Sequence, residues 1–251
     1  YMHQPSIEDH EQNRYFQDWP VLIKLARDAW MEAARLDAAR AVNVAVAWWR
    51  QPYPVFKRLA MYAAAQGDVV PPKLALGWLL EGERLWLWSI ETRRETIRLL
   101  VALSPRLGES DLADLTAAIL NGPPRNMYRD DLTPERWQEI VERDIWFRLA
   151  KIRKAGVVLG HDAQTKLAEL EAKYPKWAVT DDGRDEMALW ISDGKDLRSF
   201  TPTPRRRKEL IAWLKENPDT DHWKENDWRQ RCQNDFSAAL YGLYVLSKTD
   251  I

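Results

Sequence analysis

Residues 181–185, with the sequence DDGRD, form the stretch whose residue types and spacing could best support chemistry. The carboxylates of Asp181, Asp182 and Asp185 have the DDxxD spacing that can hold magnesium and diphosphate, because hard cations prefer oxygen ligands. Such a site needs a second acidic motif on a facing helix. The candidate for it, Asn226-Asp227, is followed by Trp-Arg-Gln and so has no second carboxylate. The glycine within the motif also favours a turn. We therefore expect a solvent-exposed helix entry at this stretch, and a metal-dependent all-α enzyme is the alternative.

A second cluster consists of the four consecutive basic residues Arg205, Arg206, Arg207 and Lys208, which could contact phosphates. Four cations in the first turn of a helix oppose the helix dipole, so they indicate a role beyond helix stability. Glu209 follows directly, and the whole chain has a net charge of −1 from 37 basic and 38 acidic residues. A solvated turn or a surface for an acidic partner is therefore favoured, with nucleic-acid binding as the alternative.

Other combinations of catalytic residue types lack a useful arrangement. His161 precedes Asp162, but adjacent residues at a helix start point in different directions, which does not suit a base and the group that orients it. The sequence contains no G-x-S-x-G, HExxH, P-loop or dinucleotide-binding motif. Cys232 is the only cysteine and lies on an apolar stripe, as expected of an inert core thiol. We therefore expect no catalytic residue and no bound cofactor in this region.

The composition is that of a globular protein, with 45% hydrophobic and 30% charged residues and a mean hydropathy of −0.53. No run approaches the ~18 apolar residues that a membrane-spanning helix needs, and a single cysteine forms no internal disulfide. The sequence therefore predicts a cytoplasmic protein without a membrane partner. Fourteen tryptophans stand against roughly three at ordinary usage, which indicates rings filling the space between helices or an exposed docking surface.

The elements that must position these residues are helices. Residues 38–49 are apolar on nearly every side, which predicts an inner helix that is buried all round. Pro52 and Pro54 then interrupt the helix and force the chain to reverse. The following segment has an apolar side and a polar side, with Lys57 and Arg58 expected to face outward. A buried helix, a proline turn and an amphipathic helix together form the unit of a stacked α-hairpin array.

The rest of the chain repeats this helical pattern without strand-like alternation. In the segment after Asp18, Leu22 and Leu25 are expected to face inward, whereas Arg94 and Glu95 are expected to face outward on a later helix. Asparagine, glycine and proline pairs mark the helix ends. Further helices are predicted over residues 18–37, 71–82, 89–103, 111–121, 133–156, 162–174, 205–216 and 228–247.

Four regions follow from this pattern, and the whole is expected to be an all-α, HEAT-like solenoid of antiparallel helix pairs with irregular repeats. On the helix that begins after Thr133, Asp144 and Arg148 are four residues apart and can form an ion pair. The chain begins Tyr1-Met2, and we expect it to be a fragment of a longer polypeptide. The regions are an N-terminal arm or short helix (1–17), the helical array (18–174), a loop-rich insertion or boundary (175–204) and C-terminal helices that continue the array (205–251).

The segments LAELEAKYPKW (167–177) and DGRDEMALW (182–190), with PVFKRLAMY (54–62), resemble the helical C-terminal regions of large bacterial antiviral proteins. Those proteins join a sirtuin-like NADase or a STAND-type ATPase to a long α-repeat region. The resemblance implies that this chain senses a phage product or organises an assembly, while a separate domain supplies the enzyme activity. It carries over no catalytic residue.

Stacked helix pairs offer a long concave face, on which tryptophan or arginine anchors would supply most of the affinity for a partner. Trp86, Trp88 and Trp146 are the candidates because they lie near polar residues or off the main apolar stripes. The sequence therefore favours a non-catalytic scaffold or sensor that binds a protein, either a phage-derived trigger or other domains of its parent protein.

Overall fold

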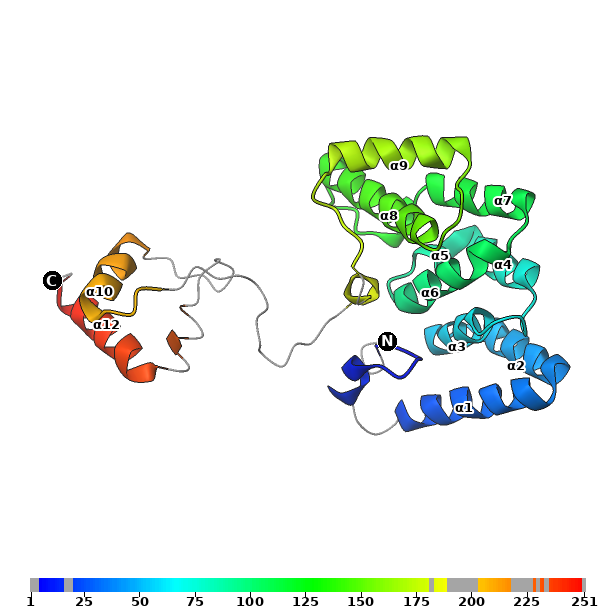
Figure 1. Ribbon diagram of the computed structural model, residues 1–251, viewed down its shortest axis with the longest axis horizontal. Coiled ribbons are helices and arrows are strands. Elements are labelled where there is room, and N and C mark those ends of the chain that lie inside the picture. Colours follow the sequence, from blue (N-terminus) through cyan, green and yellow to red (C-terminus); the bar gives the residue numbers. More distant parts are fainter. Residues whose placement is uncertain are drawn as a thin grey trace. The chain divides into compact units, whose positions relative to one another are not determined.

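The computed structural model describes residues 5–15, 20–180, 183–188, 203–217, 228, 231–232 and 235–249. Every regular element within these ranges is a helix, so the prediction of an all-α protein is confirmed for them (Figure 1). The chain forms two compact units, residues 1–191 and 192–251, and the division lies within the loop-rich segment expected at 175–204. Each unit is described by itself.

The first unit stacks its helices in layers from α1 at one end to α9 at the other (Figure 1). Three short 3-10 turns lie between successive helices: η2 (Gly82–Arg84), η3 (Ser104–Arg106) and η4 (Arg125–Met127). A fourth, η5 (Arg184–Glu186), follows α9 and packs against α6. The helices are η1 (Glu11–Tyr15), α1 (Pro20–Leu36), α2 (Ala38–Arg50), α3 (Pro54–Ala65), α4 (Pro72–Leu80), α5 (Leu85–Trp88), α6 (Arg93–Leu103), α7 (Glu109–Leu120), α8 (Pro134–Lys154) and α9 (His161–Lys173).

Local signals set the helix ends as the sequence predicts. The Asp37 carboxylate caps α2 by accepting a hydrogen bond from the Arg40 backbone N–H at 3.0 Å. The Thr133 hydroxyl caps α8 in the same way, and Pro134 occupies the first position of that helix. Gly122 lies just beyond α7 with a φ of +72°, a left-handed conformation that favours glycine.

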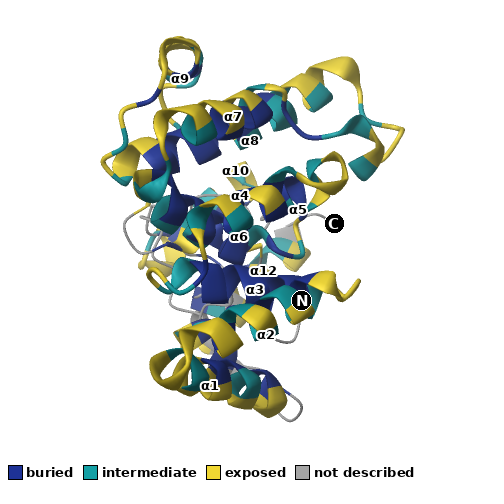
Figure 2. Cartoon of the chain, turned by 90° about the vertical axis from the view of Figure 1, so that its right-hand side faces the viewer, coloured by how far each residue is buried: buried dark blue, intermediate teal, exposed yellow. Residues whose placement is uncertain are grey.

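The burial of the first hairpin is the reverse of the prediction. In α2 only Ala41, Ala45 and Trp49 are buried, so this helix is amphipathic. The inner helix is α3, which packs between α2 and α6 and buries eight of its residues, including Lys57 and Arg58 (Figure 2). The prediction failed because a charged side chain can enter the interior when another helix supplies an acceptor, which a single helix does not reveal.

The apolar stripe expected to face inward on α1 is also wrong. Leu22 and Leu25 are 64% and 60% exposed, whereas the buried face consists of Ile23, Arg27 and Trp30. The Trp30 Nε1–H donates to the Ala41 carbonyl at 2.8 Å, which fixes α1 against α2. The buried face of α1 therefore includes side chains whose polar groups have hydrogen-bond partners, whereas Leu22 and Leu25 remain in solvent.

Helices α8 and α9 are joined at the buried carboxylate of Glu142. It accepts hydrogen bonds from the Lys173 Nζ at 2.8 Å, the Tyr174 hydroxyl at 2.6 Å and the Gln138 Nε2 at 2.9 Å. Burial raises the pKa of the Glu142 carboxyl, but these three donors outweigh that effect and lower the pKa to about 2. The joint is therefore stabilised only while the carboxylate is ionised.

We expect Glu142→Gln to lower the free energy of unfolding by about 2 kcal/mol at pH 7, allowing for solvent screening of the exposed Lys173. Because the pKa in the folded state lies below the unfolded value of about 4.3, the contribution is complete above that value. It is lost as the pH falls toward 2. Urea unfolding of both proteins at several pH values measures this, and the difference should shrink between pH 5 and pH 2. A difference that stays constant over that range would contradict the assignment.

The second unit packs α10 (Arg207–Glu216) against α12 (Phe236–Thr249). A Cβ at Gly242 would lie 3.1 Å from Leu214 Cδ1, so glycine allows the close approach of the two helices. Leu240 and Leu243 of α12 are 55% and 52% exposed. Cys232 is half-buried, and burial raises the pKa of its thiol, as expected of an unreactive cysteine. No helix of the described ranges has the length and apolar composition that crossing a bilayer requires.

Candidate binding site

The acidic motif expected to bind metal is only partly described. Asp181 and Asp182 lie outside the described residues. Asp185 accepts hydrogen bonds from the Lys151 Nζ and from the Thr180 backbone N–H, both at 2.8 Å, so both of its oxygens are engaged within the protein. Within the described ranges, no group of three or more histidine, cysteine or acidic side chains is arranged to hold an ion.

Glu186, next to Asp185, belongs to a buried ionic network on α6. Its carboxylate accepts hydrogen bonds or ion pairs from Arg94 at 3.2 Å, Arg98 at 2.8 Å and Lys151 at 2.8 Å. Arg94 and Glu186 are only 4% and 5% exposed. The acidic segment therefore clamps α6 to α8, because one carboxylate neutralises cations from both helices.

The same network ties the N-terminal segment to the core. The buried Glu95 carboxylate receives the Arg58 guanidinium of α3, with Nε at 2.6 Å and Nη2 at 3.0 Å, and the Ile7 backbone N–H at 2.8 Å. Arg94 and Glu95 were expected to face solvent, and this expectation is wrong because their partners come from distant segments. The network pairs its charges within the protein and links the N-terminal segment to α3 and α6.

The predicted partner-binding tryptophans do not form a surface. Trp88 and Trp146 are 4% and 5% exposed, so the expectation that their rings dock a partner is corrected. The Trp88 ring lies 4.1 Å below the Arg148 guanidinium, and the Trp146 ring is 5.3 Å from Trp177. Trp86 is half-buried. Every tryptophan that the structure describes is buried or half-buried, which favours their role as filling between helices.

The predicted basic cluster does lie on the surface of the second unit. Arg205, Arg206, Arg207 and Lys208 are exposed at the start of α10. Arg206 lies 3.5 Å from the Glu209 carboxylate, and the Arg207 guanidinium lies 4.8 Å from the Tyr241 ring. The cluster is therefore accessible, but its charge is partly balanced by Glu209.

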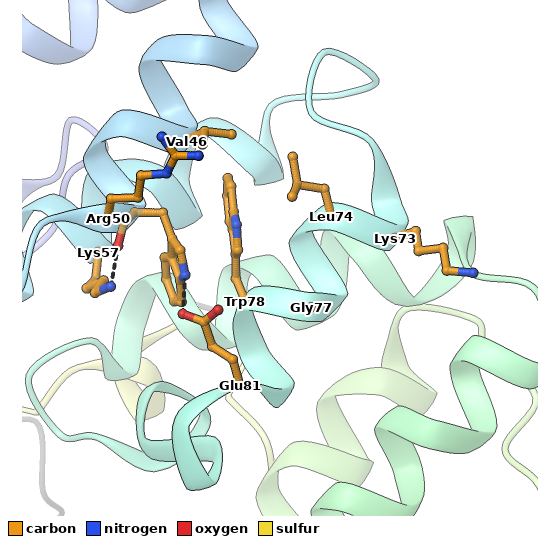
Figure 3. A pocket seen from close by; sticks show the side chains of 9 residues that line it. Val46, Arg50, Lys57, Lys73, Leu74, Gly77, Trp78 and Glu81 are labelled. Atoms are coloured by element: carbon orange, nitrogen blue, oxygen red, sulfur yellow. Dashed lines mark hydrogen bonds between the residues drawn. The ribbon is translucent and has the colours of Figure 1, made fainter.

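A pocket that the sequence did not indicate opens between α2, α3 and α4, with a volume of ≈ 480 Å³ (Figure 3). The indole rings of Trp49 and Trp78 stack behind it with a centroid distance of 5.1 Å and an interplanar angle of 13°. The Trp49 Nε1–H donates to the Glu81 carboxylate, which fixes the orientation of the ring. The lining residues are Val46, Trp49, Arg50, Lys57, Lys73, Leu74, Gly77, Trp78 and Glu81.

The lining of this pocket has a net positive charge, because it contains three cations, Arg50, Lys57 and Lys73, and one carboxylate, Glu81. The buried Lys57 Nζ donates to the Trp49 carbonyl and lies 4.2 Å from the Trp49 ring and 5.3 Å from the Trp86 ring. Burial lowers the pKa of Lys57, and the nearby Glu81 carboxylate opposes that shift. Among the described residues, neither Arg50 nor Lys73 takes part in an ion pair. The arrangement can therefore bind a negatively charged group beside an apolar one.

The only sequence signal for the pocket is a glycine within a predicted helix. Gly77 lies near the middle of α4, where glycine destabilises a helix by about 1 kcal/mol relative to alanine. The grouping of cations could not be predicted from the sequence, because Arg50, Lys57 and Lys73 come from three different helices.

No protein-family model matches this chain, and no solved structure matches it. It is similar to "Uncharacterized protein y4cA" from Sinorhizobium fredii (strain NBRC 101917 / NGR234), with 24% identity over 246 residues. The match covers 95% of this chain but only 20% of the relative, so the chain spans about a fifth of that protein's length.

Proposed function

We propose that this chain is a non-catalytic, HEAT-like helical-repeat region that acts as a scaffold or sensor within a longer bacterial protein and binds a protein surface. The layered packing of α1 to α9 supports this, because stacked helices bury a continuous core and offer their outer faces to partners. The internal neutralisation of the ionic network on α6 also supports a structural role for the most buried charges.

The observation that carries the proposal is the apolar outer face of α1. Val21, Leu22, Leu25 and Leu36 are 55%, 64%, 60% and 71% exposed on the outermost helix of the stack. The end of a helical array is normally covered by a polar face, and exposed apolar patches mark sites of association. A further helical element, from the same polypeptide or from a partner, would bury these side chains.

Two further observations support the proposal that the chain belongs to a longer protein with a role in defence. The similar protein of Sinorhizobium fredii is about five times as long as the matched region, so a region of this kind occurs there within a much larger chain. The resemblance of residues 167–177 and 182–190 to antiviral proteins supports a role in defence against phage, with the enzymatic activity in a separate domain.

Chemical cross-linking of lysines in the native cell, followed by mass spectrometry, tests the proposal. We expect cross-links from this region to another protein or to another domain of its own polypeptide. The double substitution Leu22→Glu/Leu25→Glu should remove most of them, because charged side chains cannot be buried without partners. Val158→Glu is the matched control, since Val158 is 81% exposed on a loop away from α1. Cross-links confined to this region, or unchanged by the α1 substitutions, would overturn the proposal.

A further inference from the structure

From the pocket between α2, α3 and α4 we infer that it binds a short acidic peptide segment, in which carboxylate side chains alternate with aliphatic ones. This inference rests on the proposed role in protein recognition and specifies the chemistry of the partner. It depends on three independent features of the pocket, namely its unpaired cations, its apolar lining and its glycine.

The cations surround the pocket instead of converging on one point. Arg50 lies beside the stacked indoles, whereas Lys73 lies at the far side of the pocket with its side chain directed away from them (Figure 3). Both are exposed and unpaired within the described part of the chain, while the buried Lys57 contacts the Trp49 ring from the α3 side. Separated cations suit several carboxylates along an extended segment, whereas a single phosphate is best held by donors that converge on it.

The apolar lining favours aliphatic groups over a nucleotide base. Trp49 and Trp78 are each 4% exposed, because each ring covers the other and neighbouring side chains cover the rest. A base needs an open aromatic face on which to stack, and this pair offers none. Val46 and Leu74 are half-buried at the pocket wall, where they present small apolar surfaces. Leucine or valine side chains of a peptide fit such surfaces.

Gly77 gives the third argument. A Cβ at this position would meet no atom within 4 Å, and the residue has ordinary helical geometry, so no contact inside the protein requires glycine. Glycine nevertheless weakens the helix relative to alanine. A position where glycine is neither strained nor crowded, on the wall of a pocket, fits the close approach of a ligand backbone to the helix.

Fluorescence anisotropy with defined peptides tests the inference on the purified chain at low ionic strength. The probe is a fluorescein-labelled hexapeptide of alternating glutamate and leucine, and the matched probe has glutamine in place of glutamate. We expect the acidic probe to bind at least about tenfold more tightly than the glutamine probe, and to lose affinity as salt is added. Equal binding of the two probes would overturn the inference.

Two variants locate the binding. Arg50→Glu/Lys73→Glu should weaken the acidic probe by about tenfold or more, while Arg40→Glu/Arg143→Glu should not. The control pair consists of exposed arginines outside the pocket and changes the net charge by the same amount. Gly77→Leu should abolish binding by filling the wall, with an unchanged circular dichroism spectrum and a melting temperature no lower than that of the wild type.

The outcomes separate this inference from the proposed function. If lysine cross-linking finds a protein partner but the pocket variants bind the acidic probe like the wild type, the inference fails and the proposed function stands. If ATP displaces the acidic probe from the wild type at similar concentrations, the pocket recognises nucleotides and the inference is overturned. If the probe binds as expected but cross-links stay within the region, the pocket exists and the proposed function fails.

Discussion

Replacement of Glu95 by glutamine is expected to destabilise the first unit by about 3–5 kcal/mol. The Arg58 guanidinium then remains buried without a counter-charge, and removing one partner of a buried ion pair typically costs this much. Glutamine keeps the shape of the side chain and can still accept a hydrogen bond from the Ile7 backbone N–H, so the loss reports the charge. Urea unfolding followed by tryptophan fluorescence measures the effect.

Two further variants make this prediction specific. The double substitution Arg58→Met/Glu95→Gln should recover most of the loss, because it removes the uncompensated buried charge and keeps an acceptor for the Ile7 backbone N–H. Glu139→Gln, which removes an exposed ion pair with Arg136, should change the free energy of unfolding by less than about 0.5 kcal/mol. A double variant as unstable as Glu95→Gln would show that the ion pair itself is not the source of the effect.

Replacement of Arg148 by methionine should cost about 3 kcal/mol, because the side chain is only 1% exposed and connects α8 to α5. Its guanidinium donates to the Leu87 carbonyl at 2.9 Å and to the Asp144 carboxylate at 2.9 Å, and it covers the Trp88 ring. Methionine fills much of the volume but leaves the carbonyl without this donor. Arg143→Met, an exposed change on the same helix, is the control and should have little effect.

The pH dependence of the Arg148→Met variant provides a second readout. Burial raises the pKa of the Asp144 carboxyl, but Arg148 and Arg93 outweigh it and hold that pKa below its usual range. In the wild type this carboxyl therefore stabilises the fold above the unfolded pKa of about 3.9, and the contribution is lost as the pH falls further. Without Arg148 the contribution shrinks, so the variant should lose less stability on acidification than the wild type. An equal loss in both proteins would contradict the role of Arg148.

The residues of the candidate site come from separate parts of the sequence. The pocket depends on Trp49 and Arg50 from α2, Lys57 from α3, and Gly77 and Trp78 from α4, so no single window of sequence contains it. The acidic and basic clusters could be found in the sequence because the residues of each lie within five positions of one another. The structure engages the acidic residue Asp185 in an internal ion pair and leaves the basic cluster on the surface.

The sequence by itself determined that the chain is helical and where several helices begin and end. Caps such as Asp37 and Thr133 act on a backbone N–H three residues away, and Pro54 acts on its own turn, so these signals do not depend on the rest of the fold. The pairing of Asp144 with Arg148, four residues apart on one helix, was predictable for the same reason.

Only the tertiary structure decided which helix faces are buried. Glu95 lies in the interior because Arg58, 37 residues earlier, and Ile7, 88 residues earlier, reach its carboxylate. A buried charge is stable when partners neutralise it and costly when they are absent, and those partners belong to other elements. The hydrophobic pattern of α1 predicted that Leu22 and Leu25 are buried, and both are exposed. This prediction failed because periodicity within one helix carries no information about what packs against that helix.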